Sequence, residues 1–184
     1  MPLTDERPKL IETAVKAILV DDDSTTIALT SQEWETGETP AVKWRLFHVD
    51  DEPDDIEEAR LYPAVEIAIN EPRRVHPHDP MFIQATGQIV IITHHSRDKK
   101  RAVLSELAAI VRGRIEDMGR WSILDEALPD NIGLCGLIFT PADVELNSEV
   151  LYASAFSIRL DLATTDADTT TAAATTTAAA TTTG

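Results

Sequence analysis

The sequence lacks several features that would point to a particular chemistry. Cysteine occurs once in 184 residues, so the chain can form neither an internal disulfide nor a thiolate metal cluster. Cys135 stands among apolar residues, which predicts a buried, unreactive thiol. No apolar run approaches the roughly 18 residues that span a bilayer. The N-terminus lacks the basic and apolar regions of a signal peptide. These absences predict a soluble protein made in the cytoplasm, without membrane contact.

Basic residues are scarce relative to acidic ones. Lys and Arg number 16 and Asp and Glu 32, which gives a net charge of −16. Affinity for nucleic acid comes mainly from Lys and Arg that neutralise phosphates, so the composition argues against tight nucleic-acid binding. Acidic runs concentrate in the first third of the chain, at residues 21–23 and 50–58. Such runs are typical of solvated loops; the alternative is a surface that repels DNA or meets a basic partner.

Motifs for nucleophilic or phosphate chemistry are missing as well. The sequence has no G-x-S-x-G elbow, no G-x-G-x-x-G loop and no P-loop lysine. The carboxylates of residues 50–58 are paired, but no apolar frame surrounds them that would raise the pKa of a general acid. The sequence therefore predicts no catalytic residue and no cofactor.

Histidines provide the one candidate for a metal centre. His76, His78 and Asp79 lie within four positions, and His94 and His95 follow a predicted strand. Imidazole and carboxylate groups can bind zinc or iron when they converge on the ion. His76 and His78 would converge only if their loop folded back, and no spacing matches a helix-borne zinc motif. Ordinary polar contacts are the favoured interpretation, and no metal is expected.

Hydrophobic periodicity predicts the elements of the fold. Val65, Ile67 and Ile69 alternate with smaller or polar residues, as in a half-buried strand. Further strands are predicted at residues 42–49, 88–93, 133–140 and 151–162. A first helix should end before residue 21, and a second should begin after Ser96 or Asp98 as its cap. The apolar stripe of the second helix consists of Leu104, Leu107, Ala108, Val111, Ile115 and Met118.

These elements predict an α/β (α+β) fold in a single small domain, residues 1–162. The expected order is α-β-β-β-α-β-β, with a mixed, mostly antiparallel sheet and two helices packed on one face. Three prolines predict a stiff, extended loop over residues 70–87, and an irregular link is expected over residues 121–133. Residues 163–184 are a Thr/Ala-rich, low-complexity tail with no large apolar side chain to bury.

A small basic island interrupts the acidic sequence. Arg73, Arg74, His76 and His78 fall within six positions. The island is either a solvated loop or a docking point for an acidic neighbour, including another copy of the same chain. The acidic side of such a ring or partner interface would be Asp50, Asp51, Glu52, Asp54 and Asp55.

The layout resembles the tail terminator proteins, also called tail-completion or neck proteins, of long-tailed bacteriophages. The resemblance covers roughly residues 3–162. An N-terminal amphipathic helix, the strand "LYPAVEIAI" and the strand–turn–helix "QIVIITHHSRDKKRAVLSELAAIVRGRI" carry it. The Thr/Ala tail and the acidic residues 50–58 depart from the family pattern.

This resemblance implies a structural virion protein without enzymatic activity or cofactor. Its copies would form a homohexameric ring that caps the tail tube, ends tube elongation and joins the tail to the head connector. The implied partners are other copies of the chain, the tail tube protein and the head–tail connector protein. DNA would pass through the lumen without specific binding, and an acidic lumen would repel it. The protein would lie in the tail or neck of the virion after assembly in the host cytoplasm.

Other interpretations remain open. The nearest is a head-side connector or adaptor (neck) protein of the same particle. A different class is a small metal-dependent enzyme or ligand-binding domain that uses His76, His78 and Asp79. A scaffold protein that folds on binding is a third.

Overall fold

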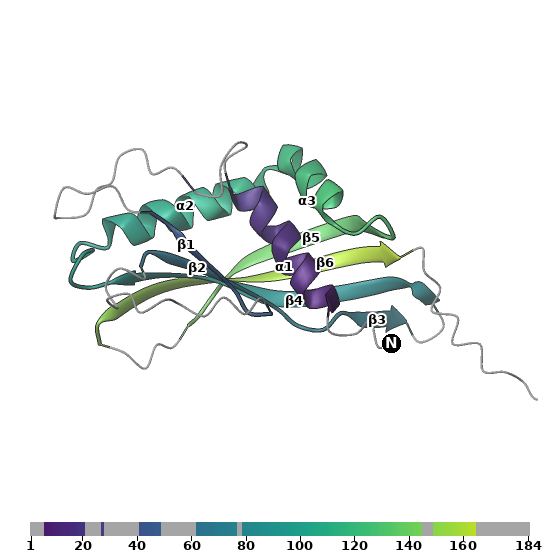
Figure 1. Ribbon diagram of the computed structural model, residues 1–184, viewed down its shortest axis with the longest axis horizontal. Coiled ribbons are helices and arrows are strands. Elements are labelled where there is room, and N and C mark those ends of the chain that lie inside the picture. The colour runs from purple at the N-terminus through teal and green to yellow at the C-terminus, as the bar shows by residue number, and fades with distance from the viewer. Residues whose placement is uncertain are drawn as a thin grey trace, which may run out of the picture.

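The described residues form six strands in one sheet, seen edge-on in Figure 1. The computed structural model describes residues 6–20, 27, 41–48, 62–76, 79–144 and 149–164. The strand order is β1-β2-β4-β6-β5, and β3 pairs with β4 outside this path. The strands are β1 (Lys43–Leu46), β2 (Ala64–Ile69), β3 (Arg73–His76), β4 (Asp79–His94), β5 (Ile132–Ala142) and β6 (Leu151–Thr164).

Strand pairing confirms the predicted mixed, mostly antiparallel sheet. β1 runs parallel to β2, while the other described pairs are antiparallel. β4 is the central strand, because it is paired along both edges. β6 pairs with one edge from Phe82 to His94. On its other edge, β2 pairs with residues 87–92 and β3 with residues 79–84. β3 thus continues the sheet where β2 ends.

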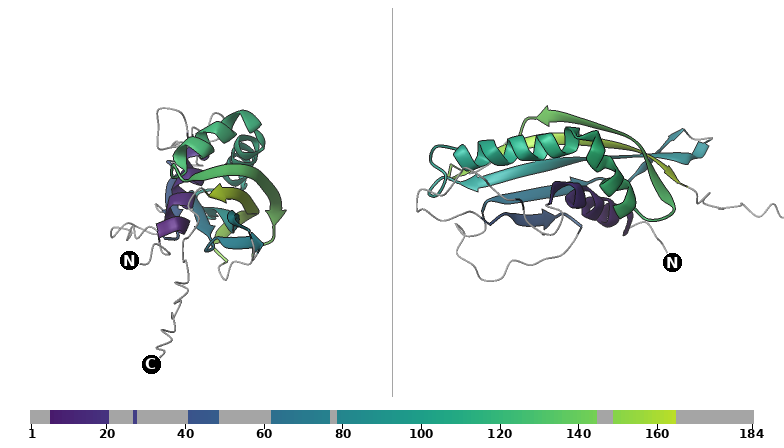
Figure 2. Two further views of the ribbon diagram at one scale, coloured as in Figure 1. Left: turned by 90° about the vertical axis from the view of Figure 1, so that its right-hand side faces the viewer. Right: turned by 90° about the horizontal axis from the view of Figure 1, so that it is seen from above.

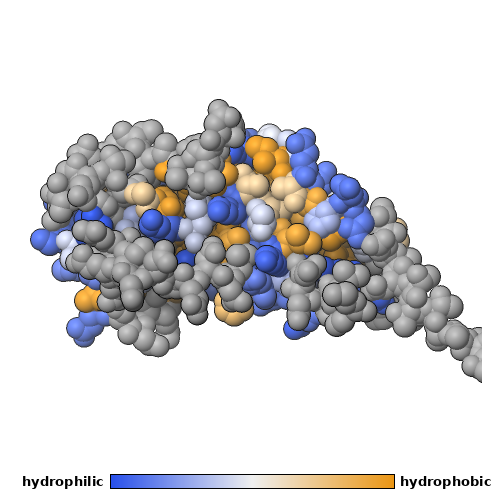
Figure 3. Space-filling view, in the orientation of Figure 1, coloured by the Kyte–Doolittle hydropathy of each residue, from blue (hydrophilic) through white to orange (hydrophobic). Residues whose placement is uncertain are grey.

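The helices cover one face of this sheet, as the end-on and top views of Figure 2 show. They are α1 (Glu6–Leu19), α2 (Ala102–Glu116), α3 (Trp121–Ala127) and the short 3-10 helix η2 (Met118–Arg120). One hydrophobic core joins all three α-helices to the inward side chains of the sheet. On the face drawn in Figure 3, hydrophobic residues gather over α1 and α3, where helix side chains close this core. The α/β class and the one-face packing are confirmed.

Period-two patterns correctly identified the inward faces of the strands. Val65, Ile67 and Ile69 of β2 are buried. The alternating residues of β6, Phe156, Ile158, Leu160 and Leu162, are buried in the same core. Trp44 and Leu46 of β1 pack against that core, whereas Phe47 is 76% exposed. A half-buried strand shows this alternation because successive side chains point to opposite faces.

The predicted stripe of α2 also faces the core. Leu104, Leu107, Val111 and Ile115 are buried against the sheet. Met118 does not extend the stripe and is 72% exposed. The helix ends at Glu116 because Asp117 begins a 3-10 turn, in which its carboxylate accepts a hydrogen bond from the Gly119 amide at 2.9 Å.

Truncating Leu107 to alanine should lower the free energy of unfolding by about 2–5 kcal/mol, because a fully buried leucine leaves a cavity behind. Leu10→Ala on α1 is the matched control. Leu10 is 42% exposed, so its loss should cost well under half as much. Urea denaturation of the two variants compares these costs. Equal, small losses would place the α2 stripe in solvent and contradict the packing.

The two ends of the helical layer are fixed by polar contacts. The side chains of Arg114 and Arg120 donate hydrogen bonds to the last carbonyls of α1, including Arg120 Nε to Ile18 O at 3.0 Å. These carbonyls have no partner within the helix, so the guanidinium groups satisfy them and bind α1 to α2 and η2. The N-cap position of α2 is Arg101 and not Asp98 or Ser96, but the Asp98 side chain still accepts hydrogen bonds from the amides of Val103 and Leu104 in the first turn.

Three local predictions were wrong. Residues 70–87 are not a stiff loop, because β3 and the first half of β4 form a hairpin there. Residues 121–133 contain the helix α3, whose Leu124 is fully buried. The order is therefore α-β-β-β-β-α-α-β-β, with three α-helices instead of two. β6 continues to Thr164, two residues beyond the expected end of the domain.

Cys135 is exposed, contrary to the prediction of a buried thiol. The register of β5 shifts between Leu134 and Gly136, which leaves Cys135 without a partner position on β6. Such a bulge re-aims side chains on an edge strand. The apolar residues next to Cys135 in the sequence therefore suggested burial, although the thiol is exposed at the bulge.

Candidate functional site

The predicted basic island lies on the β3–β4 hairpin. Arg73 and Arg74 belong to β3, and both are exposed. Arg73 lies opposite Gln84 and Arg74 opposite Ile83. His76 ends β3 and pairs with Asp79 in the register. The side chains of His76 and Asp79, and the whole of His78, lie outside the described residues.

The predicted acidic partners cannot be placed beside this island. Asp50, Asp51, Glu52, Asp54 and Asp55 all lie outside the described residues. The structure therefore locates one side of the predicted interface, the arginine side, and not the other.

Exposed hydrophobic residues accompany the arginines on the hairpin, which the sequence analysis did not anticipate. Val75 is 45% exposed, Met81 39% and Phe82 45%. Phe82 lies two positions from Gln84, the register partner of Arg73, so Phe82 and Arg73 share one face of the sheet. Arg74, opposite Ile83, and Met81 lie on the other face of the hairpin. We call Arg73, Arg74, Val75, Met81 and Phe82, which together cover both faces, the hairpin surface. Apolar groups beside arginines are the composition of a protein–protein contact.

The sheet edges are less suited to contact another chain. β1 has four residues and carries the exposed Lys43. β5 carries a bulge and Pro141, and its Leu134 amide already donates to Asp125 Oδ1 at 2.7 Å. Short strands, charges, bulges and prolines all discourage edge-to-edge pairing. The hairpin surface is accordingly the stronger candidate for an interface.

The face of the sheet opposite the helices contains a shallow hollow of about 420 Å³, lined by polar and apolar groups in similar measure. Thr86, Gln88, Thr140 and Ser157 contribute polar side chains, and Arg159 is the only charged residue among the described lining groups. Arg159 Nη2 lies 3.3 Å from Asp161 Oδ2, and Gln84 Nε2 donates to Asp161 Oδ1 at 2.8 Å. The lining supplies hydroxyl and amide groups but no acid–base pair for catalysis.

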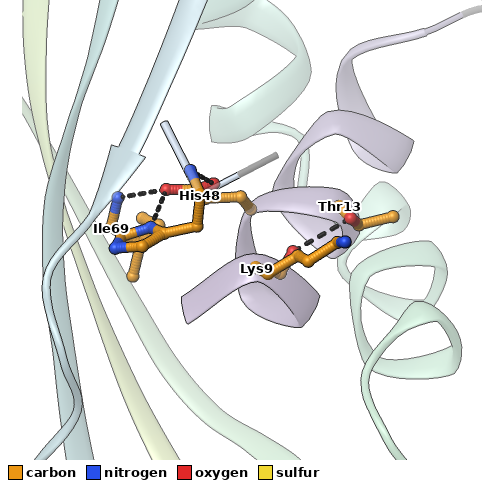
Figure 4. A network of polar contacts seen from close by, with 5 residues as sticks. Lys9, Thr13, His48 and Ile69 are labelled. Atoms are coloured by element: carbon orange, nitrogen blue, oxygen red, sulfur yellow. Dashed lines mark hydrogen bonds and ion pairs between the residues drawn. The ribbon is translucent and has the colours of Figure 1, made fainter. Parts of the chain in front are cut away.

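A buried carboxylate ties α1 to the ends of two strands. Glu12 is fully buried, and its Oε1 accepts hydrogen bonds from Ile69 N at 2.9 Å and from His48 Nδ1 at 2.7 Å. Its Oε2 accepts from His48 N at 2.9 Å. Figure 4 shows His48 and Ile69 converging on the helix from the sheet side. The role of Glu12 could not be predicted from local sequence, because its partners lie 36 and 57 positions away.

Glu12 is a structural tie, because every contact it makes satisfies the backbone or a side chain of a strand end. Glu12→Gln should lower the free energy of unfolding by about 1–3 kcal/mol. The substitution replaces one carboxylate oxygen by an NH₂ group, which cannot accept the hydrogen bond that this oxygen accepted. Thr13→Ala is the control, because Thr13 is exposed and its hydroxyl donates to the Lys9 carbonyl within the same helix at 2.9 Å. Urea denaturation measures both. A fully stable Glu12→Gln variant would show that the hydrogen bonds to His48 and Ile69 contribute little.

Aromatic and basic side chains interleave at the far end of β4. Tyr62 stacks on His94 at 6.2 Å and lies under Arg45 at 5.0 Å, while His95 and Arg101 both contact Tyr152. Burial acts to lower the pKa of Arg45, but the hydrogen bond to Glu66 and the contact with Tyr62 outweigh it, so this pKa lies above its ordinary value. His94 and His95 thus contact different aromatic rings instead of converging on one site.

Metal-binding geometry is missing from the described part of the chain. No group of three His, Cys, Asp or Glu side chains there could hold an ion. Within the same ranges, no helix is long and apolar enough to span a membrane.

Charge is divided unequally between the described and the remaining residues. The described ranges contain equal numbers of acidic and basic residues, so the net charge of −16 is carried by the other ranges. The chain was compared with known proteins. No protein-family model matches the chain, and no curated protein matches it.

Proposed function

We propose that the chain is a structural subunit of a bacteriophage tail. Its copies form a six-membered ring that caps the tail tube, ends its elongation and provides the surface that joins the tail to the head connector. The observation that carries the proposal is the hairpin surface, where one hairpin at the end of the sheet exposes apolar groups and two arginines on its two faces. Together with the layout that resembles tail terminator proteins, this surface supports a role in assembly.

Charge supports the same role. A neutral scaffold with acidic segments and an arginine-bearing hairpin offers unlike charges for contacts between copies. A ring repeats one such unlike contact around its axis. Because exposed ion pairs weaken with salt, the ring contacts should also weaken as the salt concentration rises. We expect a monomer or weak oligomer in dilute solution and a ring on tail tubes.

The uncovered sheet face is compatible with DNA passage. Its hollow is lined by hydroxyl and amide groups together with apolar ones such as Ile138. Arg159 is its one cation among the described residues, and Asp161 offsets that charge. A surface without net positive charge offers little grip on phosphates. DNA could slide past such a face without specific binding.

Tube elongation in vitro tests the proposal. Tail tubes of the phage that encodes the chain are allowed to grow from purified tube protein, with and without the added chain. Arrest of growth with the chain bound at tube ends is the expected result. Growth that continues with no bound chain contradicts the proposal. Binding to head connectors alone would instead assign the chain to the head side of the neck.

A metal-dependent enzyme is the competing class, and its test is independent of tails. Replacing His76 and His78 together by alanine should leave folding and metal content unchanged, because no metal is expected at the island. Elemental analysis of the purified wild type and variant measures this directly. Stoichiometric zinc or iron in the wild type, lost in the variant, would favour the enzyme and overturn the structural assignment.

A further inference from the structure

We propose that a basic turn between β4 and α2 is a docking site for the acidic residues 50–58 of a second copy of this chain. The basic turn consists of Arg97, Lys99, Lys100 and Arg101. This inference rests on the proposed function, because a ring supplies the second copy. It identifies a basic side of the ring contact distinct from the hairpin surface.

The basic turn concentrates positive charge within a short connection. Four cations occupy five positions after β4 ends at His94 and before α2 begins at Ala102. Lys99, Lys100 and Arg101 are exposed. A cluster of this density attracts an anionic group more strongly than isolated surface cations do.

The one acidic residue of the turn faces inward. Asp98 is 3% exposed, and its oxygens accept hydrogen bonds from Val103 N at 3.2 Å and Leu104 N at 3.0 Å. Its carboxylate is therefore committed to the first turn of α2. The helix amides are occupied by Asp98, so an anion would meet the exposed side chains of the basic turn instead.

The backbone of the turn is held in place. The amides of Arg97 and Asp98 both donate to the His94 carbonyl, and the amide of Arg101 donates to the Asp98 carbonyl. Arg101 has a positive φ of 55°, which is unusual for a residue other than glycine. Its guanidinium lies 4.1 Å from the ring of Tyr152, on which the ring of His95 also packs. A preformed cationic surface loses less conformational entropy when it binds.

The chain itself contains the complementary anion. Residues 50–58 hold seven carboxylates and no basic residue. The described ranges are electrically balanced, so this run is part of the charge excess that the scaffold does not offset. A contact between the run of one copy and the basic turn of the next pairs unlike surfaces, which a head-to-tail ring requires.

A charge swap tests the proposal without tail tubes. One variant carries Lys99→Glu and Lys100→Glu, and the other carries Asp54→Lys and Asp55→Lys. Each alone should self-associate about tenfold more weakly than the wild type, because the two glutamates cancel the net positive charge of the turn and the two lysines reduce the charge of the run from −7 to −3. An equal mixture of the two variants should recover association, since one variant supplies an unaltered acidic run and the other an unaltered basic turn. Sedimentation velocity at low salt measures the three samples, and circular dichroism verifies that each is folded.

The matched control is Lys9→Glu with Lys43→Glu, which makes the same charge change at exposed positions on α1 and β1. It should associate like the wild type. Failure of the mixture to recover overturns the proposal, as it would if each run bound the turn of its own chain. Competitors provide a second check on the self-association of the wild-type chain. If short duplex DNA weakens this association and a synthetic peptide of residues 50–58 does not, the proposal is overturned in favour of a nucleic-acid site. If the mixture recovers association but the chain does not cap tail tubes, the proposed function alone is refuted. If all the variants still cap tail tubes, this inference alone is refuted.

Discussion

Replacing Gly87 by alanine will abolish cooperative folding of the domain. Gly87 lies in the middle of β4 opposite Ile69. A Cβ added there would stand 2.2 Å from the Ala68 carbonyl oxygen and 2.7 Å from Ile69 Cδ1. The first neighbour is backbone and cannot rotate away, so β2 and β4 would have to separate. Overpacking usually costs about 1–3 kcal/mol, and we expect this substitution to exceed that range.

Gly113→Ala is the matched control for this substitution. Gly113 lies in α2, and an added Cβ would meet nothing within 4 Å. Alanine is the better helix former, so this variant should gain about 0.5–1 kcal/mol of stability. Thermal unfolding followed by circular dichroism compares the two. A Gly87→Ala variant that melts cooperatively near the wild-type temperature would contradict the close approach of β2 and β4.

Reversing Arg73 and Arg74 to glutamate will disrupt tail assembly while the monomer stays folded. Both side chains are exposed on β3, so the reversal should leave the buried core packed. The reversal places negative charge on the hairpin surface, where the proposed ring meets an acidic neighbour. We expect tails of uncontrolled length, or tails that fail to join heads. Electron microscopy of particles from a phage carrying the variant measures tail length and the fraction of joined heads.

The control for the double reversal is again Lys9→Glu with Lys43→Glu, which adds the same negative charge away from the hairpin surface. Those particles should have normal tails. Normal virions from the Arg73→Glu, Arg74→Glu phage would remove the hairpin surface from the interface. A variant that is unfolded by circular dichroism would contradict the peripheral position of the two arginines.

Elements whose sequence period matches one buried face were predictable. The stripe of α2 and the alternation of β2 and β6 arise from packing against a single core, and that core selects one side of each element. Asp98 was predictable as an acceptor for the first-turn amides of α2, although the N-cap position itself is Arg101. These local signals were enough to predict the α/β class and the packing of helices on one face.

Features that depend on distant partners were not predictable. The prolines around residue 77 indicated a loop, whereas pairing with the backbone of β6 makes residues 82–87 part of a strand. Buried Ile83 and Ala85 did carry an alternating signal that continues into Ile89 and Ile91. Glu12 resembled an ordinary polar helix residue, because its partners come from β1 and β2. The exposed apolar residues of the hairpin surface were not predictable either, because the hairpin itself depends on strand pairing.

The central claim is that copies of this chain close into a ring at the end of a tail tube. Electron microscopy of purified tail tubes incubated with the chain, with averaging of the tube ends viewed along their axis, tests it most directly. We expect a six-fold ring at one end of each tube, diminished at high salt because salt screens the charged pairs among its contacts. Tube ends that stay bare at every salt concentration, with the chain folded and in excess, would contradict the assignment.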